Sequence, residues 1–120
     1  MRNDKLSVQS MDFAVQIINL VKSLKEKRES IISNQIGRSG TSIGANICEA
    51  QYAHGKADFI AKLQIALKEC SESEYWLELL IESGYYDNND ILDKCIEVKK
   101  LLITSINTAK SKLNNQRGRC

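Results

Sequence analysis

Proline is absent from all 120 residues of this chain, and this absence constrains the fold more than any other feature. Proline is common in loops but is excluded from helix interiors, because its ring removes a hydrogen-bond donor and clashes with the preceding turn. A chain without proline is expected to consist mostly of long helices with short connections. The length fits one domain over residues 1–120, with loose ends at about 1–8 and 115–120.

The composition is that of a folded chain. Apolar residues make up 42% of it and the net charge is only +2, which excludes an intrinsically disordered protein. No run approaches 18 uninterrupted apolar residues, so a transmembrane helix is not expected. The first residues, Met1–Lys5, lead into no apolar signal-peptide core, and we therefore expect a cytoplasmic protein.

Apolar residues recur every three or four positions in four segments, which is the pattern of amphipathic helices. In the first segment the pattern is carried by Met11, Ala14, Ile17, Ile18, Val21 and Leu24. In the last segment it is carried by Ile91, Cys95, Val98, Leu102, Ile106, Ala109 and Leu113. Four helices with short turns, and no competing strand pattern, predict an all-α fold, an antiparallel up-down four-helix bundle.

The second segment, residues 30–52, combines helical periodicity with three glycines. Gly37, Gly40 and Gly44 each disfavour a helix by about 1 kcal/mol relative to alanine, yet their spacing places them on one side of it. We interpret them as a seam at which another backbone comes close. A second regularly spaced set, the polar stripe, is expected to be largely buried and hydrogen-bonded: Gln35, Arg38, Ser42, Asn46 and Glu49.

The third segment, residues 56–83, carries two apolar strips rather than one. The broader strip suits the core of the bundle and consists of Phe59, Leu63, Ala66, Leu67, Cys70, Leu77 and Ile81. The second, which we call the interface strip, consists of Ala61, Ile65, Trp76 and Leu79. A chain this short has few elements with which to cover both strips, so the interface strip predicts an oligomer contact.

Charge is distributed unevenly along the chain. Residues 56–98 hold four lysines and ten acidic residues, a net charge of −6, whereas residues 99–120 hold six basic residues and no acid. Lys99, Lys110 and Arg117 share a helix face, because 11 and 18 residues bring a helix nearly back to the same direction. We call these three the basic strip and consider them candidate nucleic-acid contacts. The alternative is that they only complement the dipole at a helix C-terminus.

The sequence shows no constellation typical of an enzyme. His54 is the only histidine, and the cysteines are too widely spaced for a zinc or redox motif. The run 37–42 lacks the Gly-Lys-Ser/Thr ending of a phosphate loop. Glu69, Glu72 and Glu78 lie near Trp76 in the third segment. They fit a solvated face, or an ion pair of one of them with Arg38, better than acid–base catalysis. We therefore expect no catalytic residues, metal or cofactor.

Two stretches of the chain resemble a known family. The first is Gln35–Ala50, which reads Gln-Ile-Gly-Arg-Ser-Gly-Thr-Ser-Ile-Gly-Ala-Asn-Ile-Cys-Glu-Ala. The second is Asp58–Glu69, followed by Glu72, Tyr75, Trp76, Leu77 and Leu80. Both are similar to the four-helix-bundle proteins first noticed in intervening sequences of bacterial ribosomal RNA genes, a family also labelled as ribosomal proteins. The likeness spans about residues 8–113.

The resemblance implies an up-down four-helix bundle that forms a ring-shaped homopentamer. Members also look like the accessory variability protein of diversity-generating retroelements, which binds RNA and works with a reverse transcriptase. The partners that the resemblance implies are further copies of the chain, RNA or DNA, and a reverse transcriptase. This chain departs from the more basic members, since its net charge is only +2.

We therefore expect a non-enzymatic accessory factor that binds RNA or DNA electrostatically. The alternative is a protein–protein scaffold with no nucleic-acid partner. The positions of the basic side chains from Lys99 onward distinguish the two hypotheses. If they cluster without acidic partners they favour nucleic acid, and if they pair with Asp and Glu they favour the scaffold.

Overall fold

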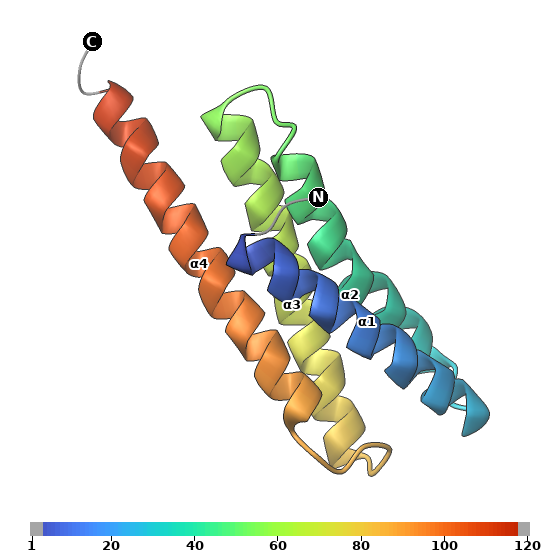
Figure 1. The fold of residues 1–120 in the computed structure, drawn as a ribbon. Helices are drawn as coiled ribbons and strands as arrows, with labels where there is room; N and C mark the ends of the chain where they lie inside the picture. Colours follow the sequence, from blue (N-terminus) through green and yellow to red (C-terminus); the bar gives the residue numbers. More distant parts are fainter. Residues whose placement is uncertain (1–3, 118–120) are drawn as a thin grey trace.

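The computed structural model describes residues 4–117 and the side chains of residues 4–115. Four helices, α1 (Lys5–Glu26), α2 (Ile31–Ala50), α3 (Lys56–Glu82) and α4 (Asp90–Arg117), form an elongated bundle of 58 × 25 × 23 Å (Figure 1). No strand occurs within the described range. The predicted all-α up-down bundle is confirmed. None of its described helices is long and apolar enough to cross a membrane.

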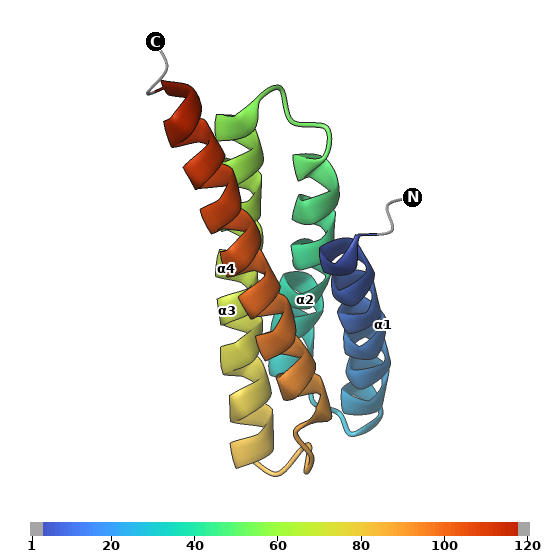
Figure 2. The same ribbon diagram turned by 60° about the vertical axis from the view of Figure 1, so that its left-hand side comes forward.

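The helices are arranged as a square. Each helix packs against the next one along the chain, and α4 closes the square by contacting α1, whereas in the described parts of the diagonal pairs no two Cα atoms lie within 8 Å of each other. The α2–α3 connection lies at one end of the bundle, and the α1–α2 and α3–α4 connections lie at the other (Figure 2). A hydrogen bond from Lys27 Nζ to the carbonyl oxygen of Tyr85 (3.1 Å) joins these last two connections.

Both terminal helices extend further than the sequence predicts. The Asp4 carboxylate caps α1 by accepting a hydrogen bond from the backbone N–H of Ser7 (2.9 Å), so residues 5–8 are already helical. At the other end α4 continues to Arg117. An Asp at the N-cap satisfies a donor that the first turn leaves without a partner, which is why the helix begins there.

The buried face of α1 agrees only in part with the predicted one, of which Ile17 and Leu24 are fully buried. Phe13, Ile17 and Leu20 lie in the core, whereas Met11 and Ile18 are about half exposed, at 50% and 47%. Apolar residues of α1 lie on more than one side of the helix, so its periodicity is compatible with two different buried faces. Contacts with α2 and α4 on two sides of the square determine which face is covered.

The glycine seam of α2 packs against α1. A Cβ atom at Gly40 would lie 2.9 Å from two side-chain carbons of Ile17, whereas one at Gly44 would lie 3.6 Å from Ser10 Oγ. Glycine at position 40 therefore allows the two helices to approach more closely than any other residue would. The seam thus packs against side chains of α1 at Gly37 and Gly40, and a backbone atom, Ser10 O, comes within 4 Å only at Gly44.

A buried glutamate determines where α2 begins. Glu29 is only 8% exposed, and its carboxylate accepts hydrogen bonds from the backbone N–H groups of Ile31 (3.1 Å), Ile32 (3.1 Å) and Ser33 (2.7 Å). The preceding residue, Arg28, has φ 62°, a left-handed conformation that reverses the chain after α1. Together these residues make the turn between the first two helices.

Candidate functional site

Arg38 of the polar stripe connects α2 to α3. Its guanidinium pairs with Glu69 (Nη1–Oε2 3.0 Å) and with Glu72 through Nη2 and Oε2. The same oxygen of Glu72 accepts a hydrogen bond from the indole N–H of Trp76 (3.0 Å). The predicted pairing of Arg38 with a glutamate of the third helix is thus found, and it joins two carboxylates rather than one.

The polar stripe is less buried than expected. The Arg38 side chain is 50% exposed, Gln35 and Glu49 are exposed, and Ser42 and Asn46 are half-buried. The hydroxyl of Ser42 donates to the Arg38 carbonyl oxygen (2.7 Å) and the Asn46 amide donates to the Ser42 carbonyl oxygen (2.9 Å). The stripe lies at the solvent edge of the α2–α3 contact because isoleucines and the small residues of α2 occupy the core side.

The charges in this cluster stabilise one another. The Trp76 indole N–H, and then Arg38, lower the pKa of Glu72 below its ordinary value of 4.5. Hydrogen bonds to Glu72 and Glu69 raise the pKa of Arg38. A third ion pair, Lys62 Nζ to Glu49 Oε1 (3.3 Å), joins α2 and α3 near the other end of the stripe. The three ion pairs link these two helices at two levels and so favour one register between them.

We predict that Arg38→Ala lowers the melting temperature by more than Lys22→Ala, which removes an exposed cation from α1. The effect arises because two carboxylates on α3 lose their partner. A carboxylate with a lowered pKa contributes stability above its ordinary pKa and loses that contribution as pH falls through the lowered value. The difference between wild type and Arg38→Ala should therefore shrink below about pH 4.5. Thermal melts by circular dichroism at neutral and acidic pH measure it, and equal melting temperatures for both variants would contradict it.

A buried pair of serines also joins α2 and α3, and sequence reasoning missed it. The hydroxyl oxygens of Ser39 and Ser73 lie 2.8 Å apart, and both residues are fully buried. The Ser73 hydroxyl also donates to the carbonyl oxygen of Glu69 (2.9 Å). The signal was available, because Ser39 lies three residues after Ile36 and four before Ile43, on the apolar period of the helix.

Cys70 of α3 and Cys95 of α4 face each other in the core. Their Sγ atoms are 3.8 Å apart, and each thiol lies within hydrogen-bond distance of the other residue's carbonyl oxygen (3.4 and 3.5 Å). The hydrogen bond with Cys70, and then burial, raise the pKa of Cys95. Cys95 is therefore a neutral thiol, and both buried cysteines pack like small apolar residues. Cys120 lies outside the described residues.

The structure separates the members of the basic strip. Lys99 is 30% exposed and its ammonium pairs with Glu74 (2.6 Å), which raises the pKa of Lys99. Lys110 is exposed, and the side chain of Arg117 lies outside those described. Lys100 and Lys112, which point away from the strip on α4, are also exposed. Lys99 therefore acts first as a link between α3 and α4.

The interface strip of α3 lies on the outside of this single chain. Ala61 and Ile65 are exposed, whereas Trp76 and Leu79 are half-buried. The indole of Trp76 is held in place by its hydrogen bond to Glu72. The strip thus offers apolar area that the described part of the chain does not fully cover.

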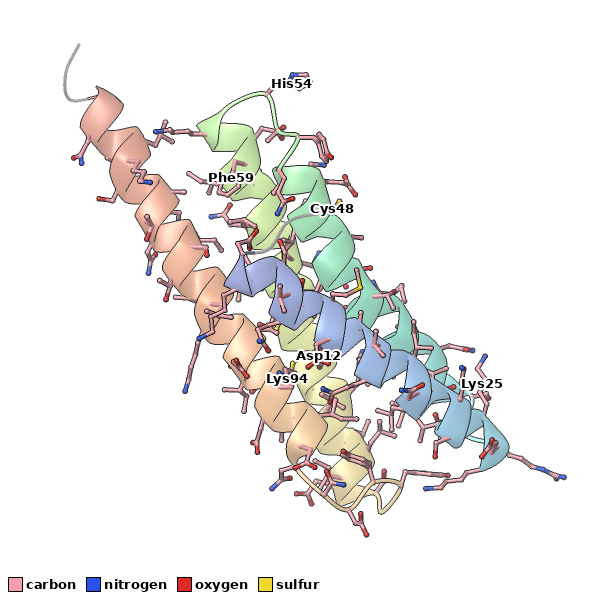
Figure 3. All side chains as sticks on the ribbon, in the orientation of Figure 1. Asp12, Lys25, Cys48, His54, Phe59 and Lys94 are labelled. Carbon is pink, nitrogen blue, oxygen red and sulfur yellow. The ribbon has the colours of Figure 1, made fainter. Side chains whose placement is uncertain are left out.

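Another exposed apolar surface runs along α1, and the sequence pattern predicted part of it to lie in the core. We call it the α1 strip, and its members are 46–50% exposed: Val8, Met11, Val15 and Ile18. Beside it, a groove of about 660 Å³ lies between α1 and α2, and Met11, Ile18 and Tyr52 line it. Cys48, labelled in Figure 3, lies on the α2 side of this groove.

The residues considered for catalysis are not brought together. His54 is exposed in the α2–α3 connection (Figure 3), and residues 37–42 are part of α2 rather than a loop. No cluster of three or more histidine, cysteine, aspartate or glutamate side chains suited to a metal occurs in the described part of the chain. Glu69 and Glu72 are engaged with Arg38, whereas Glu78 is exposed.

Comparison with known proteins places the chain in a family. The family described as "23S rRNA-intervening sequence protein" matches residues 2–104. A crystal structure of a protein of unknown function from the S23 ribosomal protein family of Bacteroides thetaiotaomicron is 52% identical. The match covers 84% of this chain and 97% of that one, with a TM-score of 0.83. No match is found among curated proteins. The chain therefore belongs to the family of 23S rRNA-intervening sequence proteins.

Proposed function

We propose that this chain is a cytoplasmic, non-enzymatic, homo-oligomeric helical bundle that binds RNA or DNA electrostatically as an accessory factor. The observation that carries the proposal is the charge of α4 beyond Glu97, its last acidic residue. Lys100, Lys110 and Lys112 are exposed and form no ion pair with other described residues. Unpaired cations on one projecting helix attract phosphates at long range.

The family supports an RNA partner. The family description refers to 23S ribosomal RNA, and the similar crystal structure is assigned to a ribosomal protein family. The likeness to the retroelement accessory protein further suggests a reverse transcriptase as a protein partner. The acidic second half of α3, Glu69–Glu82, suits such a division of roles, because nucleic acid would contact α4 and avoid that part of α3.

Self-association is the second part of the proposal. The interface strip of α3 and the α1 strip lie on helices that occupy opposite corners of the square. A contact between two different surfaces of the same chain is heterologous, and such contacts close into rings when the rotation permits. We propose a ring of copies, a pentamer as the family resemblance suggests, in which the interface strip of one copy meets the α1 strip of the next.

The oligomer can be tested with two matched isoleucines. Ile65 is 43% exposed on α3 and Ile103 is 41% exposed on α4. We predict that Ile65→Glu dissociates the wild-type oligomer, because it places a charge in an apolar contact, and that Ile103→Glu leaves it intact. Light scattering after gel filtration measures the mass of each. A monomeric wild type at micromolar concentration would refute the proposal, as would equal dissociation by both variants.

Nucleic-acid binding should be electrostatic and should weaken steeply with salt. We predict a log–log slope of affinity against salt of about −0.7 per phosphate contact on single strands, or about −0.9 on duplex DNA. The variant Lys110→Glu/Arg117→Glu should lose most of the binding at low salt. Lys22→Glu/Lys25→Glu, which reverses two exposed lysines of α1, is the matched control. Lys99 stays unchanged, because a glutamate there would face Glu74.

Fluorescence anisotropy with mixed RNA and DNA at two salt concentrations measures the affinities and so tests this prediction. Wild-type protein that binds nothing at low salt would reject nucleic-acid binding. The protein–protein scaffold would then be favoured, and the α1 strip with its groove supports that alternative, since exposed apolar patches often mark protein interfaces.

A further inference from the structure

A groove of about 600 Å³ opens at the end of the bundle that carries the α2–α3 connection. It is lined by the end of α2, the α2–α3 connection, the beginning of α3 and residues 104–112 of α4, and no residue of α1 contributes to it. Figure 2 shows why: α1 begins below the level that the other three helices reach. The side of α4 that faces α1 in the rest of the bundle is therefore uncovered here.

The polar lining of this groove is suited to an anion. Lys56 lies on its α3 side and Lys112 on its α4 side, and none of the lining residues is acidic. Thr104, Ser105 and Thr108 add three hydroxyl groups, which make no hydrogen bond to other described residues. The two ammonium groups and the three hydroxyls can all donate hydrogen bonds to the oxygens of a phosphate diester.

The α3 side of the groove adds to this preference. α3 begins at Lys56 after Gly55, and no side chain caps its first N–H groups. The N-terminus of a helix favours a nearby negative charge. The carboxylate of the same turn, Asp58, accepts a hydrogen bond from the backbone N–H of His54 (3.4 Å) and does not line the groove.

The remaining lining is apolar and includes one aromatic ring. Phe59 is half-buried and lies on the side of α3 that faces α4 (Figure 3), with Ala109 on the opposite helix. Aromatic rings provide platforms on which bases of single strands stack, and this preference tolerates any base. The bases of a duplex are already stacked on one another and cannot reach such a ring without unpairing.

We propose that this groove binds one nucleotide of a single-stranded RNA or DNA, with a phosphate between Lys56 and Lys112 and the base against Phe59. The volume fits, since small-ligand sites typically measure about 300–1,000 Å³ and this one measures about 600 Å³. The inference rests on the proposed function and specifies it: the strand enters at the end of the bundle, and the chain prefers single strands to duplexes.

Fluorescence anisotropy with a labelled ten-nucleotide oligouridine and a labelled duplex tests the groove. Lys56→Ala/Lys112→Ala should weaken oligouridine binding at least tenfold and make the salt slope shallower by about 1.4, which is two contacts of about 0.7 each. Lys22→Ala/Lys25→Ala removes the same charge from the far part of α1 and should change affinity less than twofold. Phe59→Leu should weaken oligouridine binding while leaving duplex binding unchanged.

A second variant tests whether binding is lost because the groove is blocked, rather than because positive charge has been removed from the chain. Thr108→Glu places a carboxylate at an exposed position of the lining, where we expect it to leave folding unchanged, and should abolish oligouridine binding. If the wild type binds oligouridine and both the lysine pair and Thr108→Glu bind it equally well, the groove proposal is wrong and the proposed function stands. If the wild type binds neither probe at low salt, the proposed function fails and the groove proposal fails with it.

Discussion

Gly40→Ala is expected to destabilise the protein, whereas Gly44→Ala is expected to leave it unchanged or more stable. A Cβ at position 40 would lie 2.9 Å from Cγ1 and Cγ2 of Ile17, so this fully buried side chain or the helix would have to shift. A Cβ at position 44 would make ordinary contact with Ser10 at 3.6 Å. Both variants gain about the same helix propensity, so the difference between them isolates the overpacking, which typically costs about 1–3 kcal/mol.

Chemical denaturation of the two variants beside wild type measures this difference. A double-mutant cycle gives a stricter test, because Gly40→Ala should cost less when Ile17 has been shortened by Ile17→Ala. Equal free energies of unfolding for Gly40→Ala and Gly44→Ala would show that the seam does not determine the distance between α1 and α2.

Glu29→Ala is the second substitution expected to have a large effect. It removes a buried carboxylate that accepts three hydrogen bonds from the first turn of α2. We expect a loss of about 2 kcal/mol, the upper part of the range for helix caps, since three backbone donors lose their acceptor together. The melting temperature should fall by about 6–10 °C in a domain of this size.

The matched control is Glu26→Ala, which removes an exposed carboxylate three residues earlier, at the end of α1. It should change stability by less than about 0.5 kcal/mol. Glu29→Gln keeps one acceptor oxygen and should lie between the two alanine variants. A Glu29→Ala protein as stable as Glu26→Ala would mean that water replaces the carboxylate at no cost.

The acidic charge of α3 and the basic charge of α4 were visible in the sequence, and so was the pairing of Arg38 with a glutamate of α3. Their consequences for binding were not. Lys99 and Lys110 share a direction on a helix, yet Lys99 meets Glu74 while Lys110 is exposed. Periodicity gives a direction around one helix axis and contains no information on which neighbour lies there.

The sequence by itself determined the four helices, because periodicity and the absence of proline act locally along the chain. It also determined that the glycines of α2 lie on one side. Only the tertiary structure decided that Phe13 and Leu20, rather than Met11 and Ile18, enter the core. The reason is that α1 carries apolar residues on more than one face, and burial depends on where α2 and α4 lie. The groove at the end of the bundle also depends on the tertiary structure. It exists because α1 does not extend as far as the other three helices, and the sequence pattern predicts each helix without its position beside the others.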